Sequence, residues 1–256
     1  MKMLTRLFVS CVLALSLSFA LNTSALANYA YVKNGLNSAN SATITFSPTN
    51  TGDLLVLWSR TSAGGGTPTI TSVVDNNSVS WTIGLASAAY GSGSANWVTM
   101  VYLPNCESGI TSVTVTYNGG APGALNLLIA EYSGIATTSP LIGVTSGNAQ
   151  AAPGTTANAI TSTGLSVASG VPAMIMGLVC VGGDGDTVAG TGYTGRLLSN
   201  STWLFEDLRA TTTGTQTATA TAATHGGTDS YITFTAAFKE AGGGSTPSSQ
   251  GFWIGN

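Results

Sequence analysis

Carboxylates are the most numerous side chains in this sequence that could carry chemistry, since it holds ten Asp and Glu residues but a single His. A glycosidase needs two carboxylates that face each other across a sugar cleft. The candidates are Glu107, Glu131, Glu206 and Asp207, and no spacing in the sequence brings two of them together. Glycoside hydrolysis therefore stays an alternative function to which no catalytic residue is assigned.

Glu131 is the most informative carboxylate, because Leu125, Leu127 and Ile129 precede it on the same face of a predicted strand. Burial on such a face raises the pKa of a carboxyl group unless N–H groups satisfy its charged form. We expect Glu131 to accept hydrogen bonds from the turn at Ser133 and to hold the strand end rather than to catalyse.

Nucleophilic hydrolysis needs a base beside a Ser, Thr or Cys, and that base is usually a His. His225 lies in the segment ATHGGTD between two predicted strands, and no GxSxG motif accompanies it. We therefore expect His225 on a loop, and the sequence predicts no catalytic residue and no enzyme.

Two aspartates, Asp184 and Asp186, stand two residues apart in the glycine-rich segment GGDGDT. Calcium accepts such oxygen ligands in flexible geometry, but no Glu follows at the spacing of an EF-hand loop. A solvated turn is the competing interpretation. Calcium is the one cofactor considered, and no other is predicted.

Sugar binding rests on exposed aromatic rings beside amides and hydroxyls. Tyr90 and Tyr193 flank predicted loops, and Asn76 and Asn77 could supply hydrogen bonds, so these four residues are the candidate ligand-binding set. The tryptophans are expected in the core, where Trp97 and Trp203 occupy equivalent positions of a repeat. The core tryptophans are Trp58, Trp81, Trp97 and Trp203.

The repeat is the main feature of the elements that must position these side chains. Ala124–Ile135 returns in weaker form at Tyr231–Glu240, and a Thr-rich alternating run precedes each copy. Asn96 and Thr202 are 106 residues apart, and Ala130 and Ala237 are 107 apart. No window has a helical period, and β-branched residues dominate. The sequence predicts one domain, residues 28–240, made of two similar halves at about 42–135 and 160–240.

The predicted fold class is all-β, a two-sheet jelly-roll-like β-sandwich of about ten to twelve strands with an internal pseudo-twofold repeat. A pair of separate Ig-like domains is the alternative. The turn residues Asp75–Ser78 predict a hairpin. The Ala/Thr run Gly214–Gly227 predicts either an edge strand or a small-residue face that packs closely.

The two ends of the chain differ in composition from this domain. Residues 1–27 have the charged start, apolar middle and small-residue cleavage site of a signal peptide, with removal after Ala27. No later segment resembles a transmembrane helix. Residues 241–250 have the composition of a flexible linker, and residues 251–256 form an aromatic tail that could support homo-oligomers. The tail residues are Phe252, Trp253 and Ile254.

Export permits a disulfide between Cys106 and Cys180, although the apolar run around Cys180 favours a buried free thiol. Removal of the signal peptide leaves five basic and ten acidic residues, so the surface has no electrostatic support for nucleic-acid binding.

A set of short motifs resembles β-sandwich modules of exported bacterial and phage structural proteins. These motifs are GDLL at the head of an apolar strand, the Asp75–Ser78 turn before a Trp, EYSG, and a closing AAFK, and they cover Ala42–Lys239. The resemblance implies a surface or virion protein, tied to adhesion or glycan binding, and no catalytic residue carries over.

The predicted function is therefore a non-catalytic, secreted surface or virion-type structural or adhesion module. Its partner would be a glycan or a protein at a cell or virion surface. A dedicated carbohydrate-binding module is the first alternative, and it requires a patch of exposed aromatics. The second alternative is the glycoside hydrolase.

Overall fold

The computed structural model describes residues 28–37, 41–62, 68–90, 96–118, 125–150, 158–169, 172–181, 187–199, 203–222 and 230–242. These residues form 18 strands and no helix, so the expected ten to twelve strands were too few. All strand pairs are antiparallel, and the predicted all-β sandwich is confirmed. No helix in this part of the chain is long and apolar enough to cross a membrane.

The first half of the chain contributes an inner sheet of five strands in the order β1-β8-β3-β6-β5. Its strands are β1 (Ala30–Asn37), β8 (Leu125–Ser133), β3 (Leu54–Ser62), β6 (Asn96–Leu103) and β5 (Thr82–Tyr90). The continuous apolar run of β3 is buried on both faces, as expected for a strand covered on two sides.

The second half contributes an inner sheet with the matching order, β9-β18-β12-β15-β14. Its strands are β9 (Leu141–Gln150), β18 (Ser230–Lys239), β12 (Ala173–Val181), β15 (Trp203–Ala210) and β14 (Thr194–Ser199). Strand β12 takes the central place that β3 has in the first half, which confirms that the two apolar runs occupy related positions.

Short strands cover the outer face of each inner sheet. The first half has the sheet β2-β7-β4, built from β2 (Thr43–Thr45), β7 (Ser112–Asn118) and β4 (Thr69–Asp75). The second half has β10-β17-β13, built from β10 (Asn158–Thr161), β17 (Thr219–Ala222) and β13 (Thr187–Ala189). A two-stranded sheet, β11 (Leu165–Val167) with β16 (Gly214–Gln216), completes this layer.

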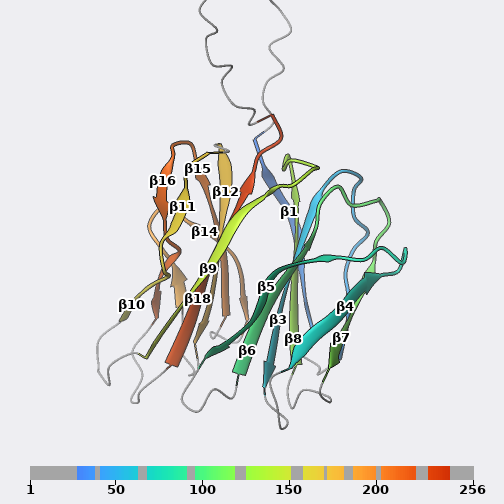
Figure 1. Cartoon of the computed structure of the whole chain (residues 1–256), viewed down its shortest axis with the longest axis horizontal. Coiled ribbons are helices and arrows are strands. Elements are labelled where there is room, and N and C mark those ends of the chain that lie inside the picture. Colours follow the sequence, from blue (N-terminus) through green and yellow to red (C-terminus); the bar gives the residue numbers. More distant parts are fainter. Residues whose placement is uncertain are drawn as a thin grey trace, which may run out of the picture.

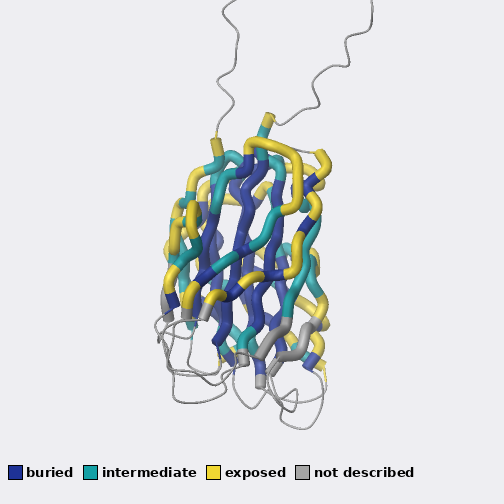
Figure 2. Tube along the Cα trace, turned by 90° about the vertical axis from the view of Figure 1, so that its left-hand side faces the viewer, coloured by how far each residue is buried: buried dark blue, intermediate teal, exposed yellow. Residues whose placement is uncertain are grey.

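The molecule is thus a stack of layers, with the two inner sheets facing each other (Figure 1) and their buried strands at the centre (Figure 2). The central core takes alternate residues of both inner sheets, such as Trp58, Met100, Phe205 and Phe234. Separate clusters fill the space between each inner sheet and its outer strands. In each half the early strands pair with the late ones, and this interleaved order favours the jelly-roll interpretation.

A pseudo-twofold relation links the halves, because two aromatic contacts across the central core join corresponding pairs of strands. Tyr132 of β8 contacts Phe205 of β15, with ring centroids 6.3 Å apart. Tyr102 of β6 contacts Phe238 of β18 at 5.7 Å. Since β8 corresponds to β18 and β6 to β15, the two contacts exchange under the same relation.

The predicted offsets within the repeat are wrong by one residue. Ala130 faces the central core, whereas Ala237 belongs to an outer cluster of the second half, so the two are not equivalent. Ala236 does face the central core and is the match for Ala130. A shift of one residue turns a side chain to the opposite face of a sheet. Trp97 and Trp203 are both buried as expected, but only Trp203 lies in the central core.

One local expectation, the hairpin at Asp75–Ser78, needs correction, whereas the favoured buried free thiol at Cys180 is confirmed. The Asp75–Ser78 turn forms, but its two strands enter different sheets and share a single bridge, Val74 with Ser80. Cys106 and Cys180 are free and buried in different clusters, so they do not form a disulfide. The Ala/Thr run forms β17, the middle strand of its sheet, and buries the small face that the sequence predicted.

Candidate functional site

The Asp75 turn is built around one buried carboxylate. Asp75 Oδ1 accepts hydrogen bonds from the backbone N–H groups of Asn77 at 2.9 Å and Val79 at 3.0 Å. Its Oδ2 accepts from the indole Nε1 of Trp81 at 3.2 Å. Ser78 adopts a φ of 65°, a left-handed conformation without glycine. The carboxylate is fully used in holding the turn.

The two candidate asparagines next to this turn have different roles. Asn76 Oδ1 accepts from the backbone N–H groups of Thr111 at 2.8 Å and Ser112 at 3.1 Å, so its carboxamide is a structural brace. Asn77 is exposed, and its Nδ2 donates to Glu107 Oε2 at 3.3 Å. Asn77 and Glu107 present polar groups to solvent, whereas Asn76 is occupied by its own chain.

The other candidate positions are placed only in part. Tyr193 is half-buried, and its hydroxyl donates to Thr217 O at 2.8 Å, so it is not the exposed ring that was expected. Burial raises the pKa of the Tyr193 phenol. Tyr90 ends β5 and pairs with Asn96, but its side chain lies outside the described residues. Five further predicted residues and the loop histidine also lie outside them: Asp184, Asp186, Phe252, Trp253, Ile254 and His225.

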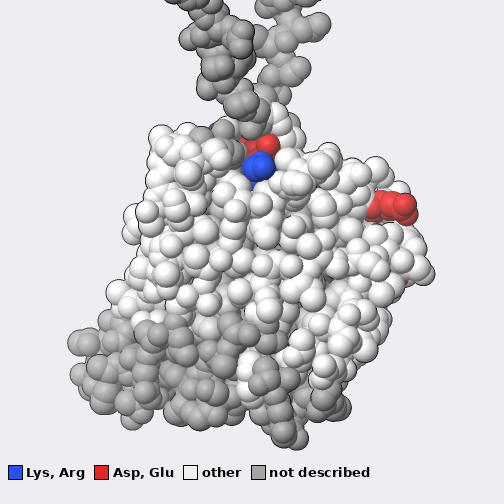
Figure 3. Space-filling view, in the orientation of Figure 1, with Lys and Arg blue, Asp and Glu red and all other residues white. Residues whose placement is uncertain are grey.

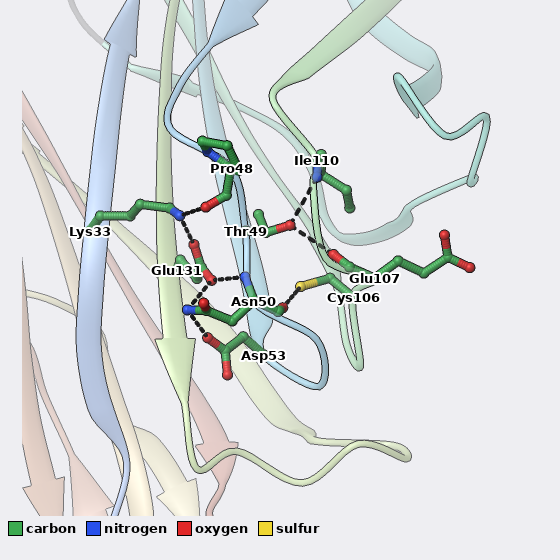
Figure 4. Close-up of polar contacts among 9 residues, drawn as sticks. All are labelled: Lys33, Pro48, Thr49, Asn50, Asp53, Cys106, Glu107, Ile110 and Glu131. Carbon is green, nitrogen blue, oxygen red and sulfur yellow. Dashed lines mark hydrogen bonds and ion pairs between the residues drawn. The ribbon is translucent and has the colours of Figure 1, made fainter.

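Glu131 lies at the centre of a polar cluster between β1, β8 and the segment that enters β3 (Figure 4). Its Oε2 is 2.8 Å from Lys33 Nζ, and its Oε1 accepts from the backbone N–H of Asn50 at 2.8 Å and from Asn50 Nδ2 at 3.3 Å. The prediction that Glu131 accepts hydrogen bonds from the turn at Ser133 is therefore wrong. Lys33 Nζ also donates to Pro48 O.

Asp53 is the second carboxyl group of this cluster. Its pKa is raised to about 6, mainly by burial and also by the neighbouring Glu131, while the hydrogen bond from Asn50 opposes the shift. The thiol of Cys106 donates to Asn50 O at 3.1 Å, and burial raises its pKa to about 11. A thiol with such a pKa stays protonated and is a poor nucleophile.

This arrangement is unlike that of a glycosidase. The two carboxyl groups of a glycosidase are about 5 Å or more apart, which leaves room for the sugar or for water. Here Asn50 Nδ2 donates to both Asp53 Oδ2 and Glu131 Oε1, and the Asn50 backbone N–H and Lys33 Nζ make the other contacts to Glu131. Among the described residues no group of three or more His, Cys, Asp and Glu side chains could hold a metal ion.

A second polar cluster joins the two halves, and sequence reasoning missed it. Arg196 forms a two-pronged ion pair with Asp207, with Nε–Oδ2 at 2.5 Å and Nη2–Oδ1 at 2.9 Å. The hydroxyls of Tyr29 and Tyr132 each donate to Asp207 at 2.9 Å. The Arg196 guanidinium also lies over the ring of Tyr31, 4.8 Å from its centroid. The cluster links β1 and β8 of the first half to β14 and β15 of the second.

This cluster breaks the pseudo-twofold symmetry. On the opposite side of the central core, the matching positions hold Tyr102 and Phe238, which pack edge to face. One side of the interface between the halves is therefore polar and the other is apolar. The Arg196–Asp207 ion pair with its Tyr donors resists separation of the two charges. Loss of either partner would leave the other as a buried charge without compensation.

Glu206 is a further buried carboxyl group, which the sequence named only among the glycosidase candidates. Its side chain lies between β12 and the outer strands, where Oε2 accepts from the backbone N–H of Gly190 at 3.1 Å. Its Oε1 has no hydrogen-bond partner among the described residues. Burial raises the pKa of Glu206 to about 7, although hydrogen bonds from Gly190 and Thr219 oppose the shift.

The described surface is correspondingly poor in charge. Six of the ten acidic residues are buried, and three basic residues pair with three of those six. The face drawn in Figure 3 shows almost no charged side chain over its described part. The outer sheet β2-β7-β4 instead exposes hydroxyl groups along its strands. The exposed Thr and Ser residues are Thr45, Thr69, Thr71, Ser72, Thr114 and Thr116.

Comparison with known proteins gives no identification: no family model matches the chain, and no curated protein is similar to it.

Proposed function

We propose that this protein is a non-catalytic, exported surface or structural module that adheres to a neutral glycan. The location of its charges is the observation that supports this function. The described carboxylates hold turns, strand pairs and the interface between the halves, while the outer sheet of the first half presents hydroxyl groups. Export through residues 1–27 is part of the same proposal.

Hydroxyl groups fit a glycan because each is both a donor and an acceptor, as are the hydroxyls of a sugar. The hydroxyl-bearing residues of the outer sheet form rows that run across neighbouring strands. Thr43 pairs with Thr114, and their hydroxyls are 2.9 Å apart, while Ser72 pairs with Thr116. Adjacent strands are about 4.8 Å apart, so these rows form a regular array.

A dedicated carbohydrate-binding module with an aromatic platform is less well supported. No aromatic side chain among the described residues is classed as exposed, and the exposed large apolar residues there are aliphatic: Val32, Leu36, Ile83 and Val188. The ring of Tyr90 is the remaining candidate from the sequence.

A glycan array tests the proposal, with residues 28–256 applied with and without calcium. We expect retention on neutral glycans that is independent of calcium. Thr116→Lys places a charge on the outer sheet of the first half and should weaken retention at least severalfold. Thr215→Lys, an exposed position on β16 of the second half, is the matched control and should not.

Two results would contradict calcium-independent binding to a neutral glycan. A protein partner would appear as binding to cells that survives glycosidase treatment, with an empty array. Retention that requires calcium would instead favour a site at Asp184 and Asp186.

A further inference from the structure

Lys33 and Glu131 are direct neighbours across the β1–β8 ladder. Tyr31 pairs with Tyr132 and Lys33 with Glu131, so Val32 is an extra residue, a β-bulge. Without the bulge, Lys33 would point to the same face as Tyr31, which packs on the central core. The bulge turns Lys33 to the outer face, where Glu131 lies. The local backbone is thus arranged to bring this amine to this carboxyl group.

The carboxyl group of Glu131 has the surroundings of a reacting centre. Lys33 Nζ is 2.8 Å from Oε2, which places the amine beside the carbon bonded to that oxygen. Two N–H groups of Asn50 point at the other oxygen, at 2.8 and 3.3 Å. Asn50 Nδ2 also donates to Asp53 Oδ2 at 3.4 Å, so a second carboxyl group that can carry protons completes the set. The Glu131 side chain is 1% exposed, so water has little access to it.

We propose that Lys33 and Glu131 condense to form an amide bond between their side chains, a covalent cross-link between β1 and β8. An ordinary ion pair requires neither a second carboxyl group nor N–H donors on the far oxygen. Here both are present beside the buried Glu131.

The reaction is a condensation without redox change. Lys33 Nζ first gives one proton to Glu131, and the neutral amine then attacks Cδ. Negative charge develops on Oε1, where the two N–H groups of Asn50 stabilise it in the manner of an oxyanion hole. Asp53 takes a proton from the attacking nitrogen and delivers it to Oε2. The Cδ–Oε2 bond breaks, one water leaves, the amide C–N bond remains, and Asp53 regains its original state.

The cross-link would secure the first strand of the folded domain. Among the described strands β1 pairs only with β8, at the edge of its sheet, so the hydrogen bonds of one ladder hold it there. An amide bond between Lys33 and Glu131 would prevent separation of β1 from β8. This inference concerns the stability of the fold, and it holds whether or not the proposed glycan binding is correct.

Intact-mass spectrometry of purified residues 28–256 tests the cross-link. We expect a mass lower than that of the sequence by one water. A proteolytic digest should contain a branched peptide in which fragmentation places the bond between Lys33 and Glu131. An intact mass equal to that of the sequence, or a water lost at another position, would overturn the proposal.

Two variants separate the cross-link from a structural ion pair. Lys33→Arg retains the positive charge and the pair with Glu131 but removes the amine, so its mass should show no loss of water. Asp53→Asn retains Lys33 and Glu131 but removes the proton carrier, so it should remain uncondensed. Loss of water in Lys33→Arg would contradict the proposed bond, and complete condensation of Asp53→Asn would contradict the role of Asp53.

Discussion

The buried carboxyl groups of this protein differ in the hydrogen-bond donors and cations that surround them. Asp207 receives an Arg and two Tyr hydroxyls, and Asp75 receives two backbone N–H groups and an indole N–H. Glu206 receives much less, because one of its oxygens has no partner in the described part of the chain. The first two carboxylates therefore stabilise the fold as anions, whereas Glu206 is better accommodated in its neutral form.

Glu206→Gln should change how stability depends on pH. Burial raises the pKa of Glu206 from 4.5 to about 7, so the folded state prefers the protonated form. The corresponding stability is fully present below about pH 4.5 and is lost as the pH rises through about 7, by about 3 kcal/mol. Gln is neutral at every pH and avoids this loss.

Denaturant melts at about pH 5 and about pH 8 measure this effect. The described ionisable groups that act on Glu206 are Asp207 and, weakly, the half-buried Tyr193. The pKa of Asp53 is also raised, but the parent and the variant both contain Asp53. Its effect therefore cancels when their pH dependences are compared. Glu107→Gln, at an exposed carboxylate, is the control. An identical pH dependence for the parent and Glu206→Gln would show that Glu206 is not the group responsible.

Asp207→Ala should be strongly destabilising. It leaves the Arg196 guanidinium and the hydroxyls of Tyr29 and Tyr132 without their acceptor. Loss of one partner of a buried ion pair costs roughly 3–5 kcal/mol. Glu107→Ala, which removes an exposed carboxylate, should change the free energy of unfolding by less than about 0.5 kcal/mol. Equal effects of the two substitutions in urea melts would disprove the structural importance of the Asp207 cluster.

Among the strands, close packing of small residues joins β12 to the outer layer of the second half. A Cβ atom at Gly177 would lie 2.7 Å from Glu206 Oε1 and 2.8 Å from Ala218 Cβ. Such distances are too short for carbon, so the glycine is required for the approach of the two layers.

Gly177→Ala should therefore destabilise the protein by about 1–3 kcal/mol through overpacking. Gly195→Ala is the matched control in the same half, because its Cβ would meet Leu204 and Ala189 at ordinary distances of 3.5 and 3.6 Å. Thermal unfolding of both variants gives the comparison. A stable Gly177→Ala variant would mean that the layers can separate at little cost.

Much of the strand arrangement is predictable from sequence, because apolar and polar residues alternate along strands such as β7, and continuous apolar runs mark the central strands β3 and β12. The face of β8 that carries Leu127, Ile129 and Glu131 was predicted correctly. The Asp207 cluster was not, since Tyr29 and Asp207 are 178 residues apart and neither strand alone indicates the other. The bulge at Val32 has no sequence signature, and it decides where Lys33 points.

The repeat shows the same limit. Similar residues in two copies reveal that the halves are related, but they do not reveal which face of a sheet each residue occupies. The offset was consequently wrong by one, and Trp97 was matched with Trp203, although only Trp203 faces the central core.

For the molecule as a whole, the two ends of the described chain lie together. Ala241 N donates to Gly134 O at 2.8 Å, and a Cβ at Gly134 would lie 2.6 Å from Asn28 O. Both described ends therefore lie at the same end of the sandwich, as Figure 1 also shows.

The aromatic tail remains a prediction from sequence, because residues 251–256 lie outside the described part. A tethered Phe-Trp-Ile segment is apolar and should bind a second copy of the chain. Analytical ultracentrifugation of residues 28–256 and 28–244 compares the two lengths. We expect a larger species for the longer chain alone, and identical monomeric sedimentation would exclude self-assembly through the tail.

The central claim is that most charged side chains stabilise the interior of the fold, whereas a neutral, hydroxyl-bearing surface contacts the glycan. The dependence of glycan retention on salt tests it most directly, because salt screens charge–charge contacts but not contacts between neutral groups. Residues 28–256 should bind a neutral glycan equally at low and high ionic strength, within about twofold. Retention confined to charged glycans and lost at high salt would contradict the claim.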